Sequence, residues 1–547
     1  MESSGEAMDS TIIPARGAAR PRERAARLVD ALRKPKCYPH PASSVEVIET
    51  HISWVFLAGE HAYKVRKPVR LAFLDFSTLE ARRRDCEEEL RLNRRTAASL
   101  YLDVVAIAGD PASPRIGAAG PVLEYAVHMR RFGQEALFDH MARAGALEPS
   151  HVDALAHAVA RFHASAARAG GASGYGTPER VLQDALDNFH DIEALEGDQR
   201  RLASLGGLRD WTLAEHRALA PLFAERRSDG FVRECHGDLH LGNVVLLEGE
   251  PVPFDCIEFE PRLRWIDVMS EVAFTAMDLE RHGLPGLAAR FVSAYAEATG
   301  DYPGLRLLRY YALYRAMVRA KVACIAAHEA GIGEARRRLA REELAAHLAL
   351  AHRLIRRARP ALVLMHGLPG SGKTWASQRL VEALRAVRVR SDVERKRRHG
   401  LAASQASGSP AGGGLYTSTE NRLTYARLGE LASWILAAGY PAIVDAAFLR
   451  REERDAFRAL ASAAGASFTI ASCSAPPAVI ERRVESRAGQ GADASEAGLA
   501  VLALQRDRAE PLGRDEIAHA VVFDTSGGAD ASAACAAVAR RLGPVGH

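Results

Sequence analysis

Between residues 44 and 129, apolar and polar positions alternate along short stretches that are separated by polar turns. Such alternation is typical of strands that bury one face. The predicted strands are residues 44–49, 53–57, 62–69, 103–107 and 121–129. From Thr78 to Ala98 the apolar positions recur at helical spacing instead. Three strands in a meander, one helix and two further strands predict a small lobe of the α+β class.

From residue 136 to residue 359 the apolar positions mostly follow the helical period, with one interruption. The predicted helices are residues 136–144, 151–167, 178–196, 284–298, 305–330 and 331–359. Two short apolar runs, 244–247 and 252–254, flank Glu248-Gly249-Glu250 and predict a hairpin inside this helical region. Pro360 ends the last helix of the series.

After Pro360, buried strands alternate with helices. The predicted strands are residues 361–366, 387–392, 441–446, 467–473 and 520–525. Alternation of this kind predicts an α/β domain with a parallel, doubly wound sheet. Ligands bind such a sheet at the carboxyl ends of its strands.

Composition narrows the classes of protein only slightly. The chain has 547 residues, 26% of them charged, and a net charge of +4, which does not favour a nucleic-acid or membrane partner. The seven cysteines are dispersed and form no C-x-x-C pair, as expected for reduced thiols in a cytoplasmic protein. No apolar run approaches the ~18–20 residues of a membrane span, and no secretory signal is recognised.

The segment from His236 to Asn243 reads HGDLHLGN, and Asp255 follows after the predicted hairpin. Phosphoryl transfer needs a carboxylate to orient and deprotonate the acceptor hydroxyl, and further oxygen ligands for magnesium. Protein kinases place these groups as H-R-D-x-x-x-x-N and D-F-G. We therefore predict Asp238 as the base, with Asn243 and Asp255 as metal ligands. The alternative is a polar loop that merely precedes a hairpin.

The segment from Gly367 to Thr374 reads GLPGSGKT, between an apolar strand and a helix. This is G-x-x-x-x-G-K-T in its required setting. The backbone of such a loop surrounds phosphate oxygens. Lys373 is expected to reach the β- and γ-phosphates, and Thr374 to offer its hydroxyl to magnesium. The other predicted phosphate-binding residues are Gly367, Leu368, Pro369, Gly370, Ser371 and Gly372.

The HGD variant of the first motif resembles the aminoglycoside phosphotransferase family, whose kinase-like fold this implies. In such folds a strand Lys pairs with the nucleotide phosphates and with a helix Glu. Lys64 is the candidate Lys, and Lys67 is the weaker competitor. Among Glu87, Glu88 and Glu89 we favour Glu87, because it shares a helix face with Arg83 and Leu90.

The same resemblance assigns supporting roles and marks one departure. His236 and Asp267 are expected to hold the backbone of the catalytic loop. Thr50-His51-Ile52 occupy the turn where kinases carry a glycine-rich loop, which leaves phosphate binding by that turn in doubt.

The second half resembles small P-loop kinases such as gluconate kinase, chloramphenicol phosphotransferase, the zeta toxins and the kinase half of polynucleotide kinase. The resemblance implies that Asp392 accepts the acceptor's proton and that Asp445 binds magnesium through water. It places Arg395 beside the acceptor, although the basic run of residues 395–398 also fits a solvated helix face. Arg483 and Arg487 are expected to be lid arginines, with an exposed arginine cluster as the alternative.

As a whole, the chain resembles a bacterial bifunctional family that joins an aminoglycoside-phosphotransferase-like domain to a P-loop ATP-binding domain of AAA type. We expect a poorly ordered segment over residues 1–36, a kinase-like domain over 37–358 and a P-loop domain over 360–547. Within the kinase-like domain, the small lobe covers residues 37–129 and the helical large lobe covers 133–358.

The leading hypothesis is an ATP- and Mg²⁺-dependent kinase with two nucleotide sites, acting on hydroxyl groups of small molecules in the cytoplasm. A second hypothesis is a nucleotide sensor in which one or both sites do not transfer phosphate. A third is a nucleic-acid 5′-end kinase, which the modest charge disfavours. The sequence names neither acceptor and gives neither an oligomeric state nor a role in antibiotic resistance.

Overall fold

The computed structural model describes residues 19–71, 74–329, 331–357, 359–409, 413–488, 495–527 and 531–543. The chain divides into two compact units. The first contains Met1–Ala146, Phe162–Tyr175 and Gly230–Ile266, and the second contains Leu147–Arg161, Gly176–Asp229 and Asp267–His547. The second unit therefore combines most of the predicted large lobe with the P-loop region.

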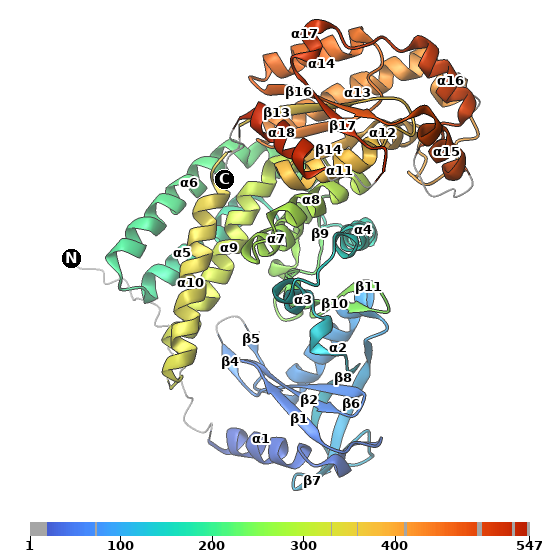
Figure 1. The fold of residues 1–547 in the computed structure, drawn as a ribbon. Helices are drawn as coiled ribbons and strands as arrows, with labels where there is room; N and C mark the ends of the chain where they lie inside the picture. The colour runs from blue at the N-terminus through green and yellow to red at the C-terminus, as the bar shows by residue number, and fades with distance from the viewer. Residues whose placement is uncertain are drawn as a thin grey trace, which may run out of the picture. The chain divides into compact units, whose positions relative to one another are not determined.

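A six-stranded antiparallel sheet in the order β1-β2-β3-β8-β6-β7 forms the base of the first unit (Figure 1). Its strands are β1 (Val45–Glu49), β2 (Ser53–Ala58), β3 (His61–Arg66), β6 (Tyr101–Asp110), β7 (Ser113–Ile116) and β8 (Val122–Arg130). Helix α2 (Leu79–Ala97) packs against β6 and β8, and the Thr78 hydroxyl caps its first turn. Strand β7 and the small ribbon of β4 (Arg70–Leu71) and β5 (Leu74–Asp75) were not predicted.

Alternation along β3 divides its side chains between two environments. Tyr63 and Val65 are buried in a core that includes Leu28 and Leu32 of helix α1 (Ala19–Leu32). Lys64, on the opposite face, reaches a glutamate of α2. Within the segment that was expected to be poorly ordered, residues 19–32 form α1, and the turn η1 (Pro35–Cys37) follows. Residues 1–18 lie outside the described residues.

Short elements complete the first unit and hold the first motif. They are η2 (Gln134–Ala136), α3 (Phe138–Ala144), β9 (Val232–Glu234), η3 (Leu241–Asn243), β10 (Val244–Leu247), β11 (Glu250–Pro253), η4 (Pro261–Leu263) and β12 (Trp265–Asp267). Strands β10 and β11 form the predicted hairpin, in which Val244 pairs with Pro253. That register places Asn243 beside Phe254, so that the two predicted metal ligands lie at the same end of the hairpin.

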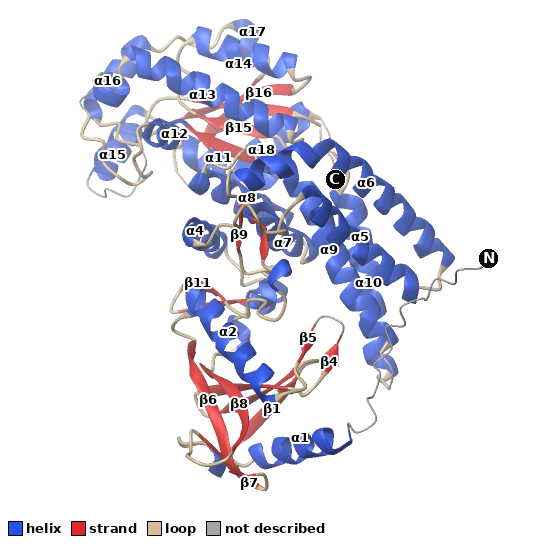
Figure 2. Cartoon of the chain, turned by 180° about the vertical axis from the view of Figure 1, so that it is seen from behind, coloured by secondary structure: helices blue, strands red, loops and turns tan. Residues whose placement is uncertain are grey.

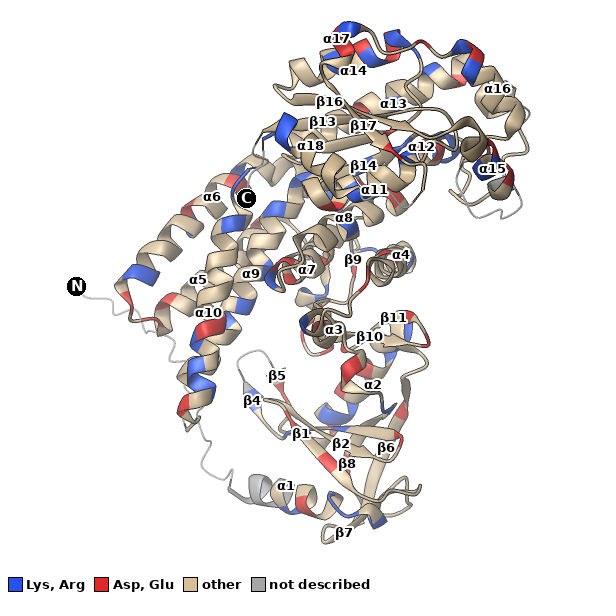
Figure 3. Cartoon of the chain, in the orientation of Figure 1, with Lys and Arg blue, Asp and Glu red and all other residues tan. Residues whose placement is uncertain are grey.

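Long helices form the first part of the second unit. They are α4 (Pro149–Ser165), α5 (Pro178–Leu195), α6 (Gln199–Ser228), α7 (Val268–Arg281), α8 (Pro285–Thr299), α9 (Leu305–His328) and α10 (Glu334–Leu354). Helix α6 was not predicted, although it buries residues at helical spacing, namely Leu205, Leu208, Thr212, Leu219 and Phe223. Acidic and basic residues are interspersed along α10 (Figure 3).

The remainder of the second unit is a parallel sheet in the order β14-β15-β13-β16-β17. The strands are β13 (Ala361–His366), β14 (Val387–Arg390), β15 (Ala442–Asp445), β16 (Ser467–Ser474) and β17 (Ala520–Asp524). The helices are α11 (Lys373–Leu384), α12 (Ser391–Arg398), α13 (Ser418–Ala437), α14 (Arg451–Ala463), α15 (Pro477–Ala488), α16 (Leu499–Arg508), α17 (Arg514–Ile517) and α18 (Ser532–Leu542), with the turn η5 (Gly414–Tyr416).

Helices cover both faces of this sheet (Figure 2). Residues of α11 and α18, such as Leu380 and Val538, share a buried core with Val363 of β13. Helices α13 and α14 pack against β15 and β16. The predicted fold class, a kinase-like α+β domain followed by a doubly wound α/β domain, is confirmed.

Two smaller expectations can be compared with the described residues. All seven cysteines are buried and free of disulfides. Among the helices that the structure describes, none combines the length and the apolar character that a membrane crossing requires.

Candidate active sites

The loop between β9 and β10 is held by a buried histidine. The backbone N–H of Asp238 donates to Nδ1 of His236 (3.3 Å), so the Nε2 of that ring carries the proton and donates to the carbonyl oxygen of Phe254 (2.8 Å). Gly237 has a φ of +90°, and a Cβ there would lie 2.9 Å from the oxygen of Leu263. The glycine is therefore required by the turn, and His236 links the Asp238 loop to the segment that precedes Asp255.

Asp238 and Asn243 are in direct contact. Nδ2 of Asn243 donates to the carbonyl oxygen of Asp238 (3.0 Å) and to its Oδ2 (3.1 Å). Both of these bonds use Nδ2, so they leave Oδ1 of Asn243 available as an acceptor. An amide oxygen left free in this way, next to a second carboxylate, is the kind of donor that Mg²⁺ takes.

That second carboxylate is Asp255, whose φ of +64° places it in the left-handed region. Its Oδ1 lies 2.5 Å from Nζ of Lys64, which also lies 2.9 Å from Oε1 of Glu89. Partial burial raises the pKa of Asp255, but the Lys64 ammonium and then the Arg66 guanidinium lower it below its ordinary value, even though Asp238 is near enough to raise it. Lys64, Asp255, Asp238 and Asn243 therefore converge on one site.

The partner of Lys64 on α2 is Glu89, so the choice of Glu87 is wrong. Glu87 lies on the exposed face and pairs with Arg83 at 2.9 Å, and Glu88 pairs with Arg91. Glu89 is fully buried and pairs with Lys64 and, at 2.5 Å, with Arg66. Burial lowers the pKa of Lys64, but Asp255 and Glu89 outweigh it and raise the pKa above its ordinary value, so the ammonium is charged.

This correction gives a matched pair of variants. Glu89→Gln should lower turnover at the Lys64 site by about 10- to 100-fold, because the charge that orients Lys64 is lost. It should also lower the free energy of unfolding by about 3–5 kcal/mol, the usual effect of breaking a buried ion pair. Glu87→Gln should change stability by less than about 1 kcal/mol and leave turnover unaltered. ADP-release assays and urea unfolding of both variants check this; equal effects would contradict it.

Arg66 was not predicted, and it centres a buried ion-pair cluster behind Lys64. Its guanidinium contacts Asp85 (2.5 Å), Glu89 (2.5 Å) and Glu258. The signal available in the sequence was its position two residues after Lys64, which puts both side chains on one face of β3. Burial raises the pKa of Glu258 to about 8, although Arg66 opposes the shift.

The raised pKa of Glu258 predicts a pH dependence of stability. The unfolded chain loses this proton near pH 4.5, and the folded chain keeps it until about pH 8. The folded state therefore binds more protons in this window, and the contribution of Glu258 to stability falls as pH rises through it. The free energy of unfolding of wild type minus that of Glu258→Gln should decrease from pH 5 to pH 8. Urea unfolding at both pH values measures it; a constant or rising difference would refute it.

The turn between β1 and β2 holds no glycine-rich loop. Thr50 closes it, because its backbone N–H donates to the carbonyl oxygen of Ser53 (2.9 Å) and its hydroxyl accepts from the N–H of Ser53 (3.0 Å). The chain therefore turns tightly here, and this turn offers no glycine-rich backbone loop to a phosphate group.

The second motif forms a P-loop between β13 and α11. Gly367, Gly370 and Gly372 all have positive φ. A Cβ on Gly367 would lie 2.6 Å from the oxygen of Cys473, and one on Gly372 would lie 2.9 Å from Cβ of Thr525. The Ser371 hydroxyl is buried and has no hydrogen-bond partner among the described residues. Tight glycine turns, an orphaned hydroxyl and the N-terminus of α11 fit a phosphate group.

Lys373 and the Asp445 carboxylate lie beside this loop. Nζ of Lys373 donates to the carbonyl oxygens of Gly367 and Leu368, both at 2.9 Å. Asp445 is buried at the end of β15, and its Oδ2 accepts from the Ser377 hydroxyl (3.0 Å), one turn after Thr374 on α11. Asp445 and Thr374 both line the same cavity, which suits a magnesium ion held through hydroxyl and carboxylate oxygens.

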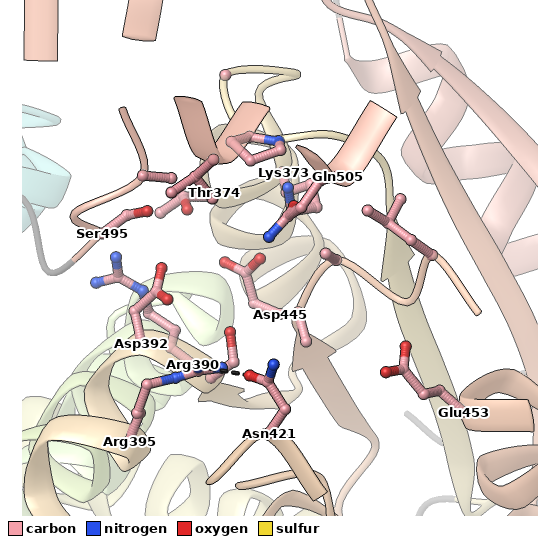
Figure 4. A pocket seen from close by; sticks show the side chains of 18 of the residues that line it. Lys373, Thr374, Arg390, Asp392, Arg395, Asn421, Asp445, Glu453, Ser495 and Gln505 are labelled. Carbon is pink, nitrogen blue, oxygen red and sulfur yellow. Dashed lines mark hydrogen bonds between the residues drawn. The ribbon is translucent and has the colours of Figure 1, made fainter. Parts of the chain in front are cut away.

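A cavity of about 1850 Å³ opens at the carboxyl ends of β13, β14 and β15 (Figure 4). Asp392, in the first turn of α12, faces it together with Lys373, Thr374 and Asp445. Arg395 is buried, donates to Oδ1 of Asn421 (2.7 Å) and lies 4.8 Å from the centre of the Tyr416 ring. The predicted site residues of the P-loop domain thus converge, and Asn421 joins them from a helix that carries no motif.

The basic run of residues 395–398 was also compatible with a solvated helix face, and that alternative is wrong for two of its four residues. Arg395 and Lys396 are buried, and Nζ of Lys396 lies 3.0 Å from Glu496. Arg398 pairs with Glu420 near the surface.

Among the lid arginines, Arg483 donates to the carbonyl oxygens of Gly370 (3.4 Å) and Thr525 (2.5 Å). The side chain of Arg487 lies outside the described residues.

Asp267 caps α7, since its Oδ1 accepts from the N–H of Met269 (2.8 Å). Its carboxylate also pairs with Arg226 of α6, which bonds Asp301 in turn. These bonds tie α6 to α7, and the predicted role of Asp267 toward His236 stays a prediction.

Comparisons with known proteins match a family to each of the two regions that hold these residues. The Phosphotransferase enzyme family matches residues 58–308, and an AAA domain matches residues 362–512. An uncharacterized protein of Mycobacterium tuberculosis is 32% identical over 480 residues, which are 86% of this chain and 93% of that protein, and one of Mycobacterium bovis matches to the same extent. The chain belongs to this bacterial family of joined phosphotransferase-like and P-loop domains. Both kinase-like parts of the family are thus present on one polypeptide.

Solved kinases resemble each part separately. A gluconokinase of Sinorhizobium meliloti is 21% identical and covers 34% of this chain and 95% of its own, with a TM-score of 0.25. The amicoumacin kinase hAmiN is 12% identical and covers 60% and 96%, with a TM-score of 0.38.

Proposed function

We propose that this protein is an ATP-dependent phosphotransferase with two nucleotide sites, each of which directs the γ-phosphoryl group to a hydroxyl of a small molecule. The observation that carries the proposal is the convergence of complementary groups at both places. Asp238, Asn243, Asp255 and Lys64 meet in the first unit. Lys373, Asp445 and Asp392 face one cavity in the second.

At the first site, Asp238 accepts the proton of the acceptor hydroxyl as its oxygen forms a bond to the γ-phosphorus. The bond from that phosphorus to the β–γ bridging oxygen breaks, and ADP leaves. Asn243 and Asp255 would hold Mg²⁺, which neutralises phosphate charge when bound. Lys64 now bridges Glu89 and Asp255, and it would turn toward the phosphates while Glu89 retains it.

At the second site, Asp392 takes the same proton-accepting role and Lys373 contacts the β- and γ-phosphates. Thr374 and Asp445 would hold Mg²⁺. Arg483, tied to Gly370 and Thr525 at the loop, is placed to stabilise charge on the phosphoryl group in transfer.

The cavity favours an acceptor that carries negative charge as well as a hydroxyl. Four acidic side chains line it, against eight basic ones: Lys373, Arg379, Arg390, Arg395, Arg422, Arg450, Arg483 and Arg508. Bound nucleotide phosphates whose charge is partly neutralised by Mg²⁺ would balance only part of this excess. We therefore place hydroxylated carboxylates and phosphates ahead of neutral alcohols as acceptors at this site.

The test is a screen of a metabolite library with ATP and Mg²⁺, read by mass spectrometry for the gain of one phosphoryl group. Products from anionic polyols that disappear with Asp392→Asn support the proposal. Labelling of oligonucleotide 5′ ends instead would favour the nucleic-acid kinase. ATP binding without consumption would favour the sensor, an alternative that the tight Thr50 turn supports for the first site.

A further inference from the structure

Strand β14 is an edge strand of the P-loop sheet, and α8 packs against it and against α11. The backbone N–H of Arg388 donates to the hydroxyl of Ser293 on α8 (3.0 Å), and the hydroxyl of Tyr302 donates to the carbonyl oxygen of Arg388 (3.3 Å). These bonds satisfy backbone groups that an edge strand would otherwise leave unpaired. Ser293 and Tyr302 lie within the Phosphotransferase enzyme family match, whereas β14 lies within the AAA domain match. Residues of one family domain therefore cover the edge strand of the other.

Glu297 of α8 pairs with both arginines of that strand. Its Oε2 lies 3.2 Å from Nη2 of Arg388, and its Oε1 lies 3.3 Å from Nη1 of Arg390. Arg388 and Arg390 are two residues apart, so they share one face of β14. Burial raises the pKa of Glu297, but the two guanidinium groups lower it below its ordinary value. The carboxylate is therefore ionised at neutral pH and balances two cations, the buried Arg388 and the partly buried Arg390.

Arg388 is linked to the proposed magnesium ligand by two hydrogen bonds that share one serine hydroxyl. Its Nη1 donates to the Ser377 hydroxyl (3.1 Å), and that hydroxyl donates to Oδ2 of Asp445 (3.0 Å). Nε of Arg388 is buried without a hydrogen-bond partner among the described residues. Arg390 is the register partner of Asp445 and lines the cavity (Figure 4). A chain of contacts thus runs from Glu297 through Arg388 and Ser377 to Asp445.

We infer that Glu297, supplied by the phosphotransferase-family domain, is a positioning residue of the P-loop site: it holds the Arg388 guanidinium away from Asp445 and so keeps that carboxylate available to Mg²⁺. The inference rests on the proposed function in one respect, namely that Asp445 binds the metal. A guanidinium that loses its buried counter-charge seeks the nearest carboxylate. Asp445 is within reach of Arg388, since both side chains already bond the Ser377 hydroxyl, and its charge would then be neutralised.

The experiment uses the full chain with Lys64→Ala and Asp238→Asn as the parent, so that the first site neither binds the nucleotide nor turns it over. It measures the Mg²⁺ concentration needed for half-maximal binding of a fluorescent non-hydrolysable ATP analogue, and for half-maximal ATP turnover. Glu297→Gln should raise both by about 10-fold, the usual effect of altering a residue behind a metal ligand. Glu382→Gln is the matched control, because it breaks another ion pair of α8 with the P-loop domain, to Arg290 at 2.5 Å. It should leave the Mg²⁺ dependence unchanged.

The double variant Glu297→Gln/Arg388→Gln separates positioning from a merely structural role. If Arg388 competes for Asp445, removing Arg388 should restore most of the Mg²⁺ affinity that Glu297→Gln loses. If the two substitutions only damage the structure, the double variant should lose more Mg²⁺ affinity than Glu297→Gln alone. Unchanged Mg²⁺ dependence in Glu297→Gln, or a further loss in the double variant, overturns the inference. If the parent variant binds the analogue but does not consume ATP, phosphoryl transfer at the P-loop site is refuted. The Mg²⁺ dependence of analogue binding then still decides the role of Glu297.

Discussion

Replacing Lys373 with alanine should lower ATP turnover at the P-loop site by about 10²–10³-fold, the range expected when one preorganised charge is removed from a developing transition state. The residue begins α11, and its ammonium now bonds the carbonyl oxygens of Gly367 and Leu368. A bound phosphate would compete for the same donor. Alanine leaves the loop glycines and the helix N-terminus in place, so folding should be retained.

The measurement is ADP release by Lys373→Ala in the Asp238→Asn parent, where the first site contributes nothing. Arg398→Ala is the control, because Arg398 pairs with Glu420 near the surface and is not among the residues that line the cavity. It removes a positive charge from the same domain and should keep turnover within about twofold, as surface substitutions usually do. Equal turnover in Lys373→Ala and its parent would refute the role of the P-loop in transfer.

Asp238→Asn, in a Lys373→Ala background, should lower turnover at the first site by about 10²–10⁴-fold, the contribution of a positioned general base. Asparagine keeps the size of the side chain and can still accept from Nδ2 of Asn243, which now lies 3.1 Å from Oδ2 of Asp238. It cannot take a proton from the acceptor. Nucleotide affinity should change little, because Lys64 and Asp255 remain.

Measuring the rate of ADP release at increasing ATP concentrations gives kcat and KM separately, so that an effect on turnover is distinguished from an effect on ATP affinity. Glu250→Gln, an exposed substitution on β11 of the same hairpin, should leave both unchanged. A fall in kcat for Asp238→Asn with an unaltered KM for ATP supports the base. An unaltered kcat would leave the first site as a nucleotide sensor.

The parts of the sites that the sequence predicted are those whose geometry is local. The P-loop is fixed by glycines, a lysine and a strand-to-helix turn within eight residues, so reading Gly367 to Thr374 placed the loop. Asp238 and Asn243 were found from their spacing within one loop, and Asp255 was found because a two-stranded hairpin of fixed register separates it from Asn243. Their convergence follows from the backbone alone.

The missed parts depend on helix phase or on contacts far apart in the chain. Glu87 and Glu89 differ by about 200° around a helix, so the choice between them turned on which face of α2 meets β3. In the sequence Arg66 is an ordinary strand residue, and only the folded structure brings Glu89 and Glu258 into contact with it. Glu297 and Arg388 carry no motif, and only the packing of α8 on β14 brings them together. Helix α6 was missed for another reason: its buried positions recur at helical spacing, so the sequence pattern was sufficient to predict it.

The central claim is that one chain binds nucleotide at two places of different architecture. Isothermal titration of the full chain with a non-hydrolysable ATP analogue and Mg²⁺ tests it most directly. We expect two equivalents per chain for wild type, one for Lys373→Ala and one for Lys64→Ala. A single equivalent in wild type that Lys373→Ala abolishes entirely would contradict the claim, since the Lys64 site would then bind no nucleotide.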